Sequence, residues 1–224
     1  FANCGLPYYI GEVIKDREQL LVVTPETLKD MLGVEARPNS EVLSIDRQNK
    51  TVMVKDLVSG REYQESYDKL VLATGAVPIV PPLPGVDLPG VFILHNIPEM
   101  DAIESYLKEA APKRVVVVGG GFIGLEIAEN LVERGLQVSV VEMLNQVMAP
   151  VDFELAAMVH HHLAFHNIGL VLGDGLKSIE QTGIDTGMRV NLASGKSLPA
   201  EMVILAIGVR PETSLAKTAG LELG

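Results

Sequence analysis

Residues 114–142 read RVVVVGGGFIGLEIAENLVERGLQVSVVE, and the character of this stretch changes several times along its length. Four valines at 115–118 form a continuous β-branched run, which is typical of a strand buried on both faces. Closely spaced glycines follow without a gap, and the apolar residues of 125–134 then recur at helical spacing until Gly135 ends the pattern. A second run of strand character, 137–141, ends at Glu142. The order of strand, glycine turn, helix and strand predicts part of a parallel sheet.

The glycines of this turn each have a steric reason to be there. Gly119 permits the tight turn after the strand, Gly121 lets the backbone approach a diphosphate at the helix N-terminus, and Gly124 lets helix and strand pack closely. Glu142 ends the second strand, where a carboxylate can accept hydrogen bonds from the adenosine ribose hydroxyls and would repel a 2′-phosphate. Residues 143–145 supply no Arg or Lys to pair with such a phosphate. The pattern predicts a Rossmann-like NADH site formed by Gly119, Gly121, Phe122, Ile123, Gly124 and Glu142.

Composition argues against several classes of function. The formal net charge of −11 disfavours DNA or RNA partners, which are bound largely through Lys and Arg. No apolar run reaches membrane-spanning length, and residues 1–5 have neither the basic flank nor the apolar core of a secretory signal, so we expect a soluble, cytoplasmic protein. The consecutive histidines 160–162 would point about 100° apart on a helix and cannot converge on one ion, so no metal site is expected.

The residues before this sheet have a different pattern. A helix is expected over 24–32, and three β-type runs separated by polar turns predict a small antiparallel meander at 42–45, 51–54 and 61–67. Residues 70–73 are expected to form a buried strand, and 77–85, with four prolines, an extended segment between domains. After a helix near 98–111, the second domain is expected to begin near residue 112. It should continue with a helix at 153–166 and strands at 169–172, 188–192 and 202–206.

Cys4 is the only cysteine, so this sequence offers no internal disulfide. Pro7 suits the first turn of a helix running towards Val13 or beyond, which would place the Cys4 sulfur at a helix N-terminus. The positive end of that helix would favour the nucleophilic thiolate. A buried, inert cysteine is the alternative, because free cysteines are among the most buried residue types. The residues alone leave both interpretations open.

Several segments resemble one known family. Residues 1–11, FANCGLPYYIG, resemble the redox-active segment of the coenzyme A disulfide reductases, which belong to the FAD-dependent pyridine nucleotide-disulfide oxidoreductases. Residues 67–76, YDKLVLATGA, resemble the family's strand and A-T-G turn beside the FAD, and 119–126 resemble its NADH fingerprint. Residues 205–212, LAIGVRPE, resemble the turn that closes the nicotinamide pocket and contains Gly208. The resemblance spans essentially the whole chain.

The resemblance implies roles for individual residues. Cys4 would be the single redox cysteine, and Asn3 would orient its thiolate or the substrate sulfur. Glu126 would help to position the nicotinamide, while Phe122 would be a ring that moves aside when NADH enters. The residues lining the flavin region would be Val42, Ala73, Thr74 and Gly75. Electrons would pass from NADH through FAD to Cys4, whose thiolate would attack a small-molecule disulfide or persulfide such as coenzyme A disulfide.

The expected fold class is α/β, with a Rossmann-like parallel-sheet NAD domain and a partial FAD domain that carries the small antiparallel meander. By this expectation residues 1–111 belong to the FAD domain, 112–211 bind NAD(H), and 212–224 return to the FAD domain. The family's first glycine fingerprint, its later Gly-Asp flavin segment and its dimerisation domain are absent from these residues. We therefore expect an internal fragment that binds NADH, retains FAD poorly and is inactive alone, with a homodimer for the full-length protein.

Three functions are compatible with these residues. The first is a flavoprotein NADH:disulfide oxidoreductase that reduces coenzyme A disulfide or a persulfide through Cys4. The second is an NADH oxidase or peroxidase in which the cysteine cycles through a sulfenic acid. The third is a non-catalytic NADH-binding module, for which Cys4→Ser would leave function intact.

Overall fold

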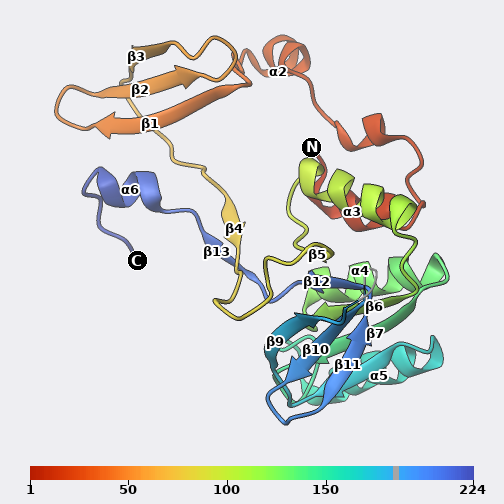
Figure 1. The fold of residues 1–224 in the computed structure, drawn as a ribbon. Coiled ribbons are helices and arrows are strands. Elements are labelled where there is room, and N and C mark those ends of the chain that lie inside the picture. Colours follow the sequence, from red (N-terminus) through yellow and green to blue (C-terminus); the bar gives the residue numbers. More distant parts are fainter. Residues whose placement is uncertain (184–186) are drawn as a thin grey trace. The chain divides into compact units, whose positions relative to one another are not determined.

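The computed structural model describes residues 1–183 and 187–224, and internal contacts divide the chain into two units (Figure 1). Unit 1 consists of Phe1–Leu21 and Pro78–Val209, and unit 2 of Val22–Val77 and Arg210–Gly224. The chain passes between them three times, after Leu21, after Val77 and after Val209. The last two passages lie in strands β4 (Ala76–Pro78) and β13 (Val209–Pro211), which pair as a two-stranded sheet. The predicted FAD-binding segments 1–111 and 212–224 and NAD(H)-binding segment 112–211 are defined by cofactor, whereas these units are defined by internal contacts, so the cofactor division stays a prediction.

Unit 1 is built on a five-stranded parallel sheet in the order β5-β12-β6-β7-β8, accompanied by an antiparallel sheet in the order β11-β10-β9. Its helices are η1 (Asn3–Gly5), α1 (Leu6–Ile10), η2 (Arg17–Leu20), α3 (Ile97–Glu109), α4 (Phe122–Glu133) and α5 (Phe153–Phe165). Its strands are β5 (Val91–Phe92), β6 (Arg114–Val118), β7 (Gln137–Glu142), β8 (Gly169–Leu172), β9 (Leu176–Gln181), β10 (Met188–Leu192), β11 (Ser197–Ala200) and β12 (Met202–Leu205). Among the described residues, none of the helices has both the length and the apolar character needed to cross a bilayer.

The valines of β6 explain how the layers of unit 1 are held together. Val115 and Val117 pack in one core cluster with apolar residues of α1, α3, α4 and α5. Val116 and Val118 point to the opposite face and pack with residues of β9, β10 and β11. Successive residues of a strand face opposite sides, so one continuous apolar run serves two cores. The parallel sheet is therefore covered by helices on one face and by the antiparallel sheet on the other.

The sequence pattern anticipated most of unit 1. The predicted α/β class is confirmed, as are the helices near 98–111 and 153–166 and the strands at 169–172, 188–192 and 202–206, with ends shifted by a residue or two. Strands β5, β9 and β11 were not predicted. The helix after Pro7 is shorter than expected: α1 ends at Ile10, whereas the prediction extended it to Val13 or beyond. Gly11 follows as its C-cap, and the backbone N–H groups of residues 11–14 bond back to carbonyls of the helix.

Unit 2 contains the predicted meander. Strands β1 (Ser40–Asp46), β2 (Thr51–Asp56) and β3 (Glu62–Ser66) pair antiparallel in that order. Helices α2 (Pro25–Leu32) and α6 (Ser214–Thr218) complete the unit. Thr24 caps α2 by accepting a hydrogen bond from the Thr27 N–H at 3.2 Å, and Gly33 ends it with a φ of +66°. The bounds of this helix agree with the prediction of a helix over 24–32.

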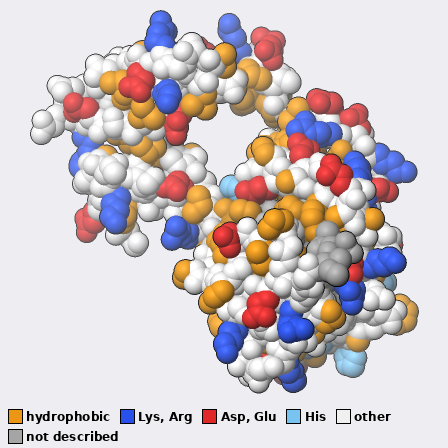
Figure 2. Space-filling view, in the orientation of Figure 1, with side chains coloured by type: hydrophobic (Ala, Val, Ile, Leu, Met, Phe, Trp, Pro, Cys, Tyr) orange, Lys and Arg blue, Asp and Glu red, His pale blue; other side chains and the backbone are white. Residues whose placement is uncertain are grey.

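The prediction of a buried strand at 70–73 is wrong. Residues 70–75 form no regular secondary structure, and the Val71 side chain is 85% exposed. A short apolar run is buried only where strands pair beside it, and among the described residues none pairs with this one. Further apolar side chains of unit 2 are also exposed and are interspersed with charges of both signs (Figure 2).

Candidate functional site

The turn between β6 and α4 has the geometry that its glycines require. Gly119 has a φ of +112°, a conformation that L side chains rarely adopt, and a Cβ there would collide with the carbonyl of Ala206, the residue that follows the neighbouring strand β12. A Cβ at Gly124 would collide with the Gly119 carbonyl. These two glycines are therefore required by the protein's own packing, in agreement with the steric reasons inferred from the sequence.

Gly121 differs from both, because a Cβ built on it would meet no protein atom within 4 Å. Its φ of −81° and ψ of −175° are accessible to any residue, so nothing within the fold demands glycine at this position. Gly121 is also the N-cap of α4, where no side chain caps the first-turn N–H groups and no acidic residue lies in the first turn. Free N–H groups beside an open backbone surface suit an anionic group such as a diphosphate.

Glu142 lies at the end of β7 directly against this turn. Its Oε2 accepts a hydrogen bond from the Gly120 N–H at 2.7 Å, and its Oε1 accepts one from the Leu144 N–H at 2.8 Å. A carboxylate has about four acceptor positions, so two remain for hydroxyl donors from a ligand. The two backbone bonds fix the carboxylate in place, and the acid is therefore preorganised to receive a ribose.

A cleft of about 660 Å³ opens over the glycine turn, and its volume is in the range of small-molecule and cofactor sites. It is bounded by the C-terminal ends of β6, β7 and β12, the side of a parallel sheet where ligands of doubly wound folds bind. Its lining includes Gly119, Gly121, Phe122, Ile123, Glu142, Met143, Leu144, Asp174, Ile207 and Gly208. Among the described residues that line it, none is Lys or Arg. The site thus offers apolar surface, backbone N–H groups and carboxylates, with no side-chain cation.

The cleft is lined by most of the residues predicted to bind NADH, and the two that do not line it are Gly124, which packs against Gly119, and Glu126. Gly208, at a φ of +108°, lies at the opposite edge of the cleft, and its carbonyl accepts a hydrogen bond from the Ile79 N–H at 2.9 Å. Phe122 is 58% exposed at the start of α4, where its ring also lines a second, smaller groove between α4 and α5. Glu126, one turn further on, lines only that second groove.

Cys4 lies in η1, directly before α1, and its side chain is exposed. The prediction that it precedes a helix N-terminus is confirmed, and the alternative of a buried cysteine is wrong. Asn3 is the first residue of the same short helix and is also exposed. Neither residue lines the cleft.

The residues expected to line the flavin region all lie in unit 2. Val42 is in β1, and Ala73, Thr74 and Gly75 follow one another in an irregular, exposed segment. Thr74 Oγ1 donates to the carbonyl of Glu212 at 2.5 Å, and the Glu212 N–H donates to the carbonyl of Gly75 at 2.9 Å. Gly75 has a φ of +71° and an open α-carbon surface. This arrangement is compatible with a backbone turn that a ligand can approach.

Asp174 is a cleft residue that the sequence reasoning missed. It is buried at the end of β8, where its Oδ2 accepts a hydrogen bond from Ser194 Oγ at 2.5 Å and its Oδ1 accepts one from the Ser194 N–H at 3.0 Å. The hydrogen bond from the Ser194 hydroxyl is the main cause that lowers the pKa of Asp174 below its ordinary value, and Asp174 is a second acidic residue, beside Glu142, in the wall of the cleft. The feature of the sequence that could have identified Asp174 is an acidic residue between Gly173 and Gly175, directly after a predicted strand.

The described part of the chain contains no group of three or more His, Cys, Asp or Glu side chains arranged to hold a metal ion. His160 of the three consecutive histidines instead accepts a hydrogen bond at Nε2 from the Val147 N–H at 3.2 Å. Its ring therefore supports the loop between β7 and α5.

Comparison with known proteins agrees with this geometry. The family described as "Pyridine nucleotide-disulphide oxidoreductase" matches residues 1–224. The chain is 38% identical over 225 residues to an NADH oxidase of Methanocaldococcus jannaschii and 31% identical over 223 residues to a coenzyme A disulfide reductase of Staphylococcus aureus. Each comparison covers 100% of this chain and 49% of the relative, so the chain spans about half the length of these curated relatives.

Among solved structures, reduced CoADR-RHD of Bacillus anthracis shares 48% sequence identity with this chain at a TM-score of 0.94, covering 100% of this chain and 40% of that one. The fold is thus shared throughout, and the resemblance seen in residues 1–11, 67–76, 119–126 and 205–212 is confirmed. With the family pattern running through its whole length and the glycine turn and acid in place, the chain belongs to the pyridine nucleotide-disulphide oxidoreductases, a family of enzymes.

Proposed function

We propose that this chain is part of a flavoprotein that oxidises NADH and reduces coenzyme A disulfide or a coenzyme A persulfide through Cys4. The observation that carries the proposal is the cleft around Gly121 and Glu142, which an uncapped helix end and a fixed carboxylate equip for a dinucleotide. The coenzyme A disulfide reductase of Staphylococcus aureus supports the choice of substrate class.

The cleft favours NADH over NADPH. Glu142 retains acceptor positions for the two ribose hydroxyls, and a 2′-phosphate on the same ribose would meet this carboxylate, with Asp174 also in the wall. Because no Lys or Arg is among the described lining residues, nothing there would offset that repulsion. The ring of Phe122 stands in the lining, so we propose that it moves when NADH enters. We also propose that Glu126, one turn further along α4 in the adjoining groove that Phe122 shares, orients the nicotinamide.

For the flavin we propose residues 1–111 and 212–224 as the contributing segments, with residues 112–211 binding NAD(H). Within them, the backbone near Val42 and the turn Ala73–Gly75 would contact FAD. Gly75 supports this, since its positive φ and its open α-carbon leave room for a ligand. When bound, FAD would carry electrons from the nicotinamide to sulfur.

Cys4 supplies the sulfur chemistry. Its thiolate attacks one sulfur of the disulfide, the S–S bond breaks, and one thiol leaves while Cys4 holds the other half as a mixed disulfide. The two electrons of NADH then reduce the mixed disulfide, which releases the second thiol and restores the Cys4 thiolate. In sum, one NADH and one proton convert one disulfide into two thiols. Asn3, the preceding residue, is proposed to orient the reacting sulfur. We propose that the full-length protein acts as a cytoplasmic homodimer.

The name of the Methanocaldococcus jannaschii relative, NADH oxidase, favours one second candidate. In that function an oxygen species accepts the electrons and Cys4 cycles through a sulfenic acid. Both candidates use the same cleft and the same sulfur, and they differ in the acceptor.

The test is stopped-flow kinetics on the full-length flavoprotein. The protein is reduced with NADH and then mixed with coenzyme A disulfide, coenzyme A persulfide, hydrogen peroxide or oxygen. We expect the first two to reoxidise it fastest and the Cys4→Ser variant to lose this reaction while still binding NADH. Faster reoxidation by peroxide or oxygen would favour the second candidate. Full turnover by Cys4→Ser would show that the cysteine has no role in the reaction, and NADH binding with no electron transfer to any of the four acceptors would indicate a non-catalytic module.

A further inference from the structure

The segment that carries Cys4 is anchored to α4, the helix whose first residues, Phe122 and Ile123, line the cleft. Leu6, Ile10 and Leu20 of residues 1–21 are buried in the core cluster that also contains Ile127 and Leu131 of α4. The Ala2 N–H donates to the carbonyl of Leu20 at 2.8 Å. Cys4 therefore lies on a closed loop whose two ends are fixed to each other and whose apolar side chains are fixed to unit 1.

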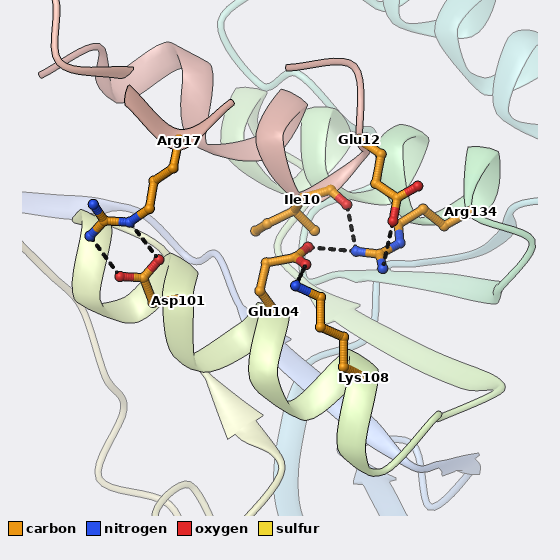
Figure 3. A network of polar contacts seen from close by, with 7 residues as sticks. All are labelled: Ile10, Glu12, Arg17, Asp101, Glu104, Lys108 and Arg134. Atoms are coloured by element: carbon orange, nitrogen blue, oxygen red, sulfur yellow. Dashed lines mark hydrogen bonds and ion pairs between the residues drawn. The ribbon is translucent and has the colours of Figure 1, made fainter. Parts of the chain in front are cut away.

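A polar cluster adds a second attachment at the far end of α1 (Figure 3). Arg134, the C-cap residue of α4, donates from Nη1 to the carbonyl of Ile10 at 2.8 Å and to Glu104 Oε1 of α3 at 2.5 Å. Its Nη2 lies 3.2 Å from Glu12 Oε1. The side chains of Arg134 and Glu104 are only 15% and 8% exposed, so this is a largely buried ion pair. Lys108 reaches the other oxygen of Glu104 at 3.4 Å but is 66% exposed.

The positive charge of Arg134 lies at the C-terminal end of α1, where it is electrostatically favourable. Ile10 is the last residue of α1, where carbonyl groups lack partners within the helix and a positive charge is favourable. The backbone also approaches α4 closely here, because a Cβ at Gly11 would collide with the buried side chain of Asn130. Arg134 therefore holds the C-terminal end of α1 at the point where the backbone packs closely on α4.

We propose that Arg134 is a positioning residue for the reaction of Cys4. By holding the carbonyl end of α1, it fixes the orientation of η1 and of the thiol relative to the helix whose other end faces the dinucleotide cleft. Buried ion pairs stabilise proteins little compared with apolar replacements of similar size, but their geometry can define a single arrangement. The proposal rests on the proposed function, since it assigns the cluster a role in sulfur reduction.

The main test variant is the double change Glu104→Leu/Arg134→Met in the full-length protein. Arg134→Met alone leaves the buried Glu104 carboxylate with the exposed Lys108, at 3.4 Å, as its remaining ion-pair partner, and can fail to fold. Replacing both Arg134 and Glu104 by apolar residues preserves packing and removes the hydrogen bond to the Ile10 carbonyl. We expect kcat for disulfide reduction to fall at least about tenfold, because small misplacements of reacting groups are costly. The KM for NADH and the melting temperature should stay unchanged. Lys108→Met is the matched control, since it removes an exposed contact of the same Glu104 and leaves Arg134 in place.

A second readout does not depend on turnover. The rate at which iodoacetamide alkylates Cys4, followed by peptide mass spectrometry, should be slower in the double variant and unchanged in Lys108→Met. Gly11→Ala should have the same effect, because its Cβ would collide with the side chain of Asn130 and push α1 away from α4.

The two proposals fail in different ways. If the wild-type protein reduces no disulfide, or if Cys4→Ser still does, the proposed function fails, and the alkylation rates still report on positioning. If Cys4→Ser is inactive but the folded double variant keeps wild-type kcat and wild-type alkylation, Arg134 has no positioning role.

Discussion

Replacing Gly121 with alanine separates ligand binding from folding. The added methyl group would project into open space, since no protein atom lies within 4 Å of its position. The backbone angles, φ −81° and ψ −175°, are also accessible to alanine. If the cleft binds a dinucleotide as proposed, the methyl group would occupy the surface against which the diphosphate rests.

The expected effect on stability is small because two contributions oppose each other. Alanine is a poorer N-cap than glycine, by up to roughly 1 kcal/mol, while it reduces the entropy of the unfolded chain by about 0.4–1 kcal/mol. The effect on binding is larger. Losing one charge-assisted hydrogen bond between an N–H of α4 and the diphosphate costs about 1.5–3 kcal/mol, or roughly a ten- to hundredfold increase in Kd for NADH.

The assay combines thermal denaturation with calorimetric titration of NADH. Gly124→Ala is the contrasting variant, because its Cβ would collide with the Gly119 carbonyl, and overpacking of this kind costs about 1–3 kcal/mol of stability. We expect Gly121→Ala to lose affinity at unchanged melting temperature and Gly124→Ala to lose melting temperature. A Gly121→Ala protein that binds NADH as tightly as the wild type would refute the assignment of this cleft to the dinucleotide.

Three further perturbations follow from the same structure. Glu142→Ser should weaken NADH binding more than NADPH binding, because it removes the ribose acceptor and the repulsion of a 2′-phosphate together; an unchanged ratio of the two dissociation constants would contradict this. The hydrogen bond from the Lys113 N–H lowers the pKa of the Glu201 carboxyl below its ordinary value of 4.5. The ionised carboxylate therefore stabilises the fold fully above pH 4.5, and this stabilisation is lost as the pH falls through the lowered pKa of the folded protein. Glu201→Gln should therefore flatten the acid limb of a plot of melting temperature against pH, and an unaltered limb would count against this carboxylate. Ile10→Ala should cost about 2–5 kcal/mol in denaturant titrations, since this side chain is fully buried, and a loss within error would mean that α1 is not docked as described.

Local patterns were enough to predict the elements whose cause is local. The helix at α2 carries its own cap, proline and terminal glycine, and the turn at Gly119–Gly124 carries its steric reasons in the glycines themselves. The prediction for residues 70–73 is wrong because the pattern shows that these residues are apolar but does not show whether other strands pair beside them. Burial of a strand depends on neighbours distant in the sequence, and periodicity contains no information about them.

The same distinction applies to the site. Glu142 could be assigned because a parallel sheet brings the ends of adjacent strands together, so a spacing along the chain predicts a meeting in space. Nothing comparable links Arg134 to the carbonyl of Ile10, 124 residues earlier in the chain, because their contact depends on how α1 docks on α4. Their meeting also shows why the cysteine segment cannot be understood from residues 1–11 alone. The sulfur belongs to a short helix whose orientation is set at its far end, by a side chain that the sequence marks only as the last charged residue before Gly135.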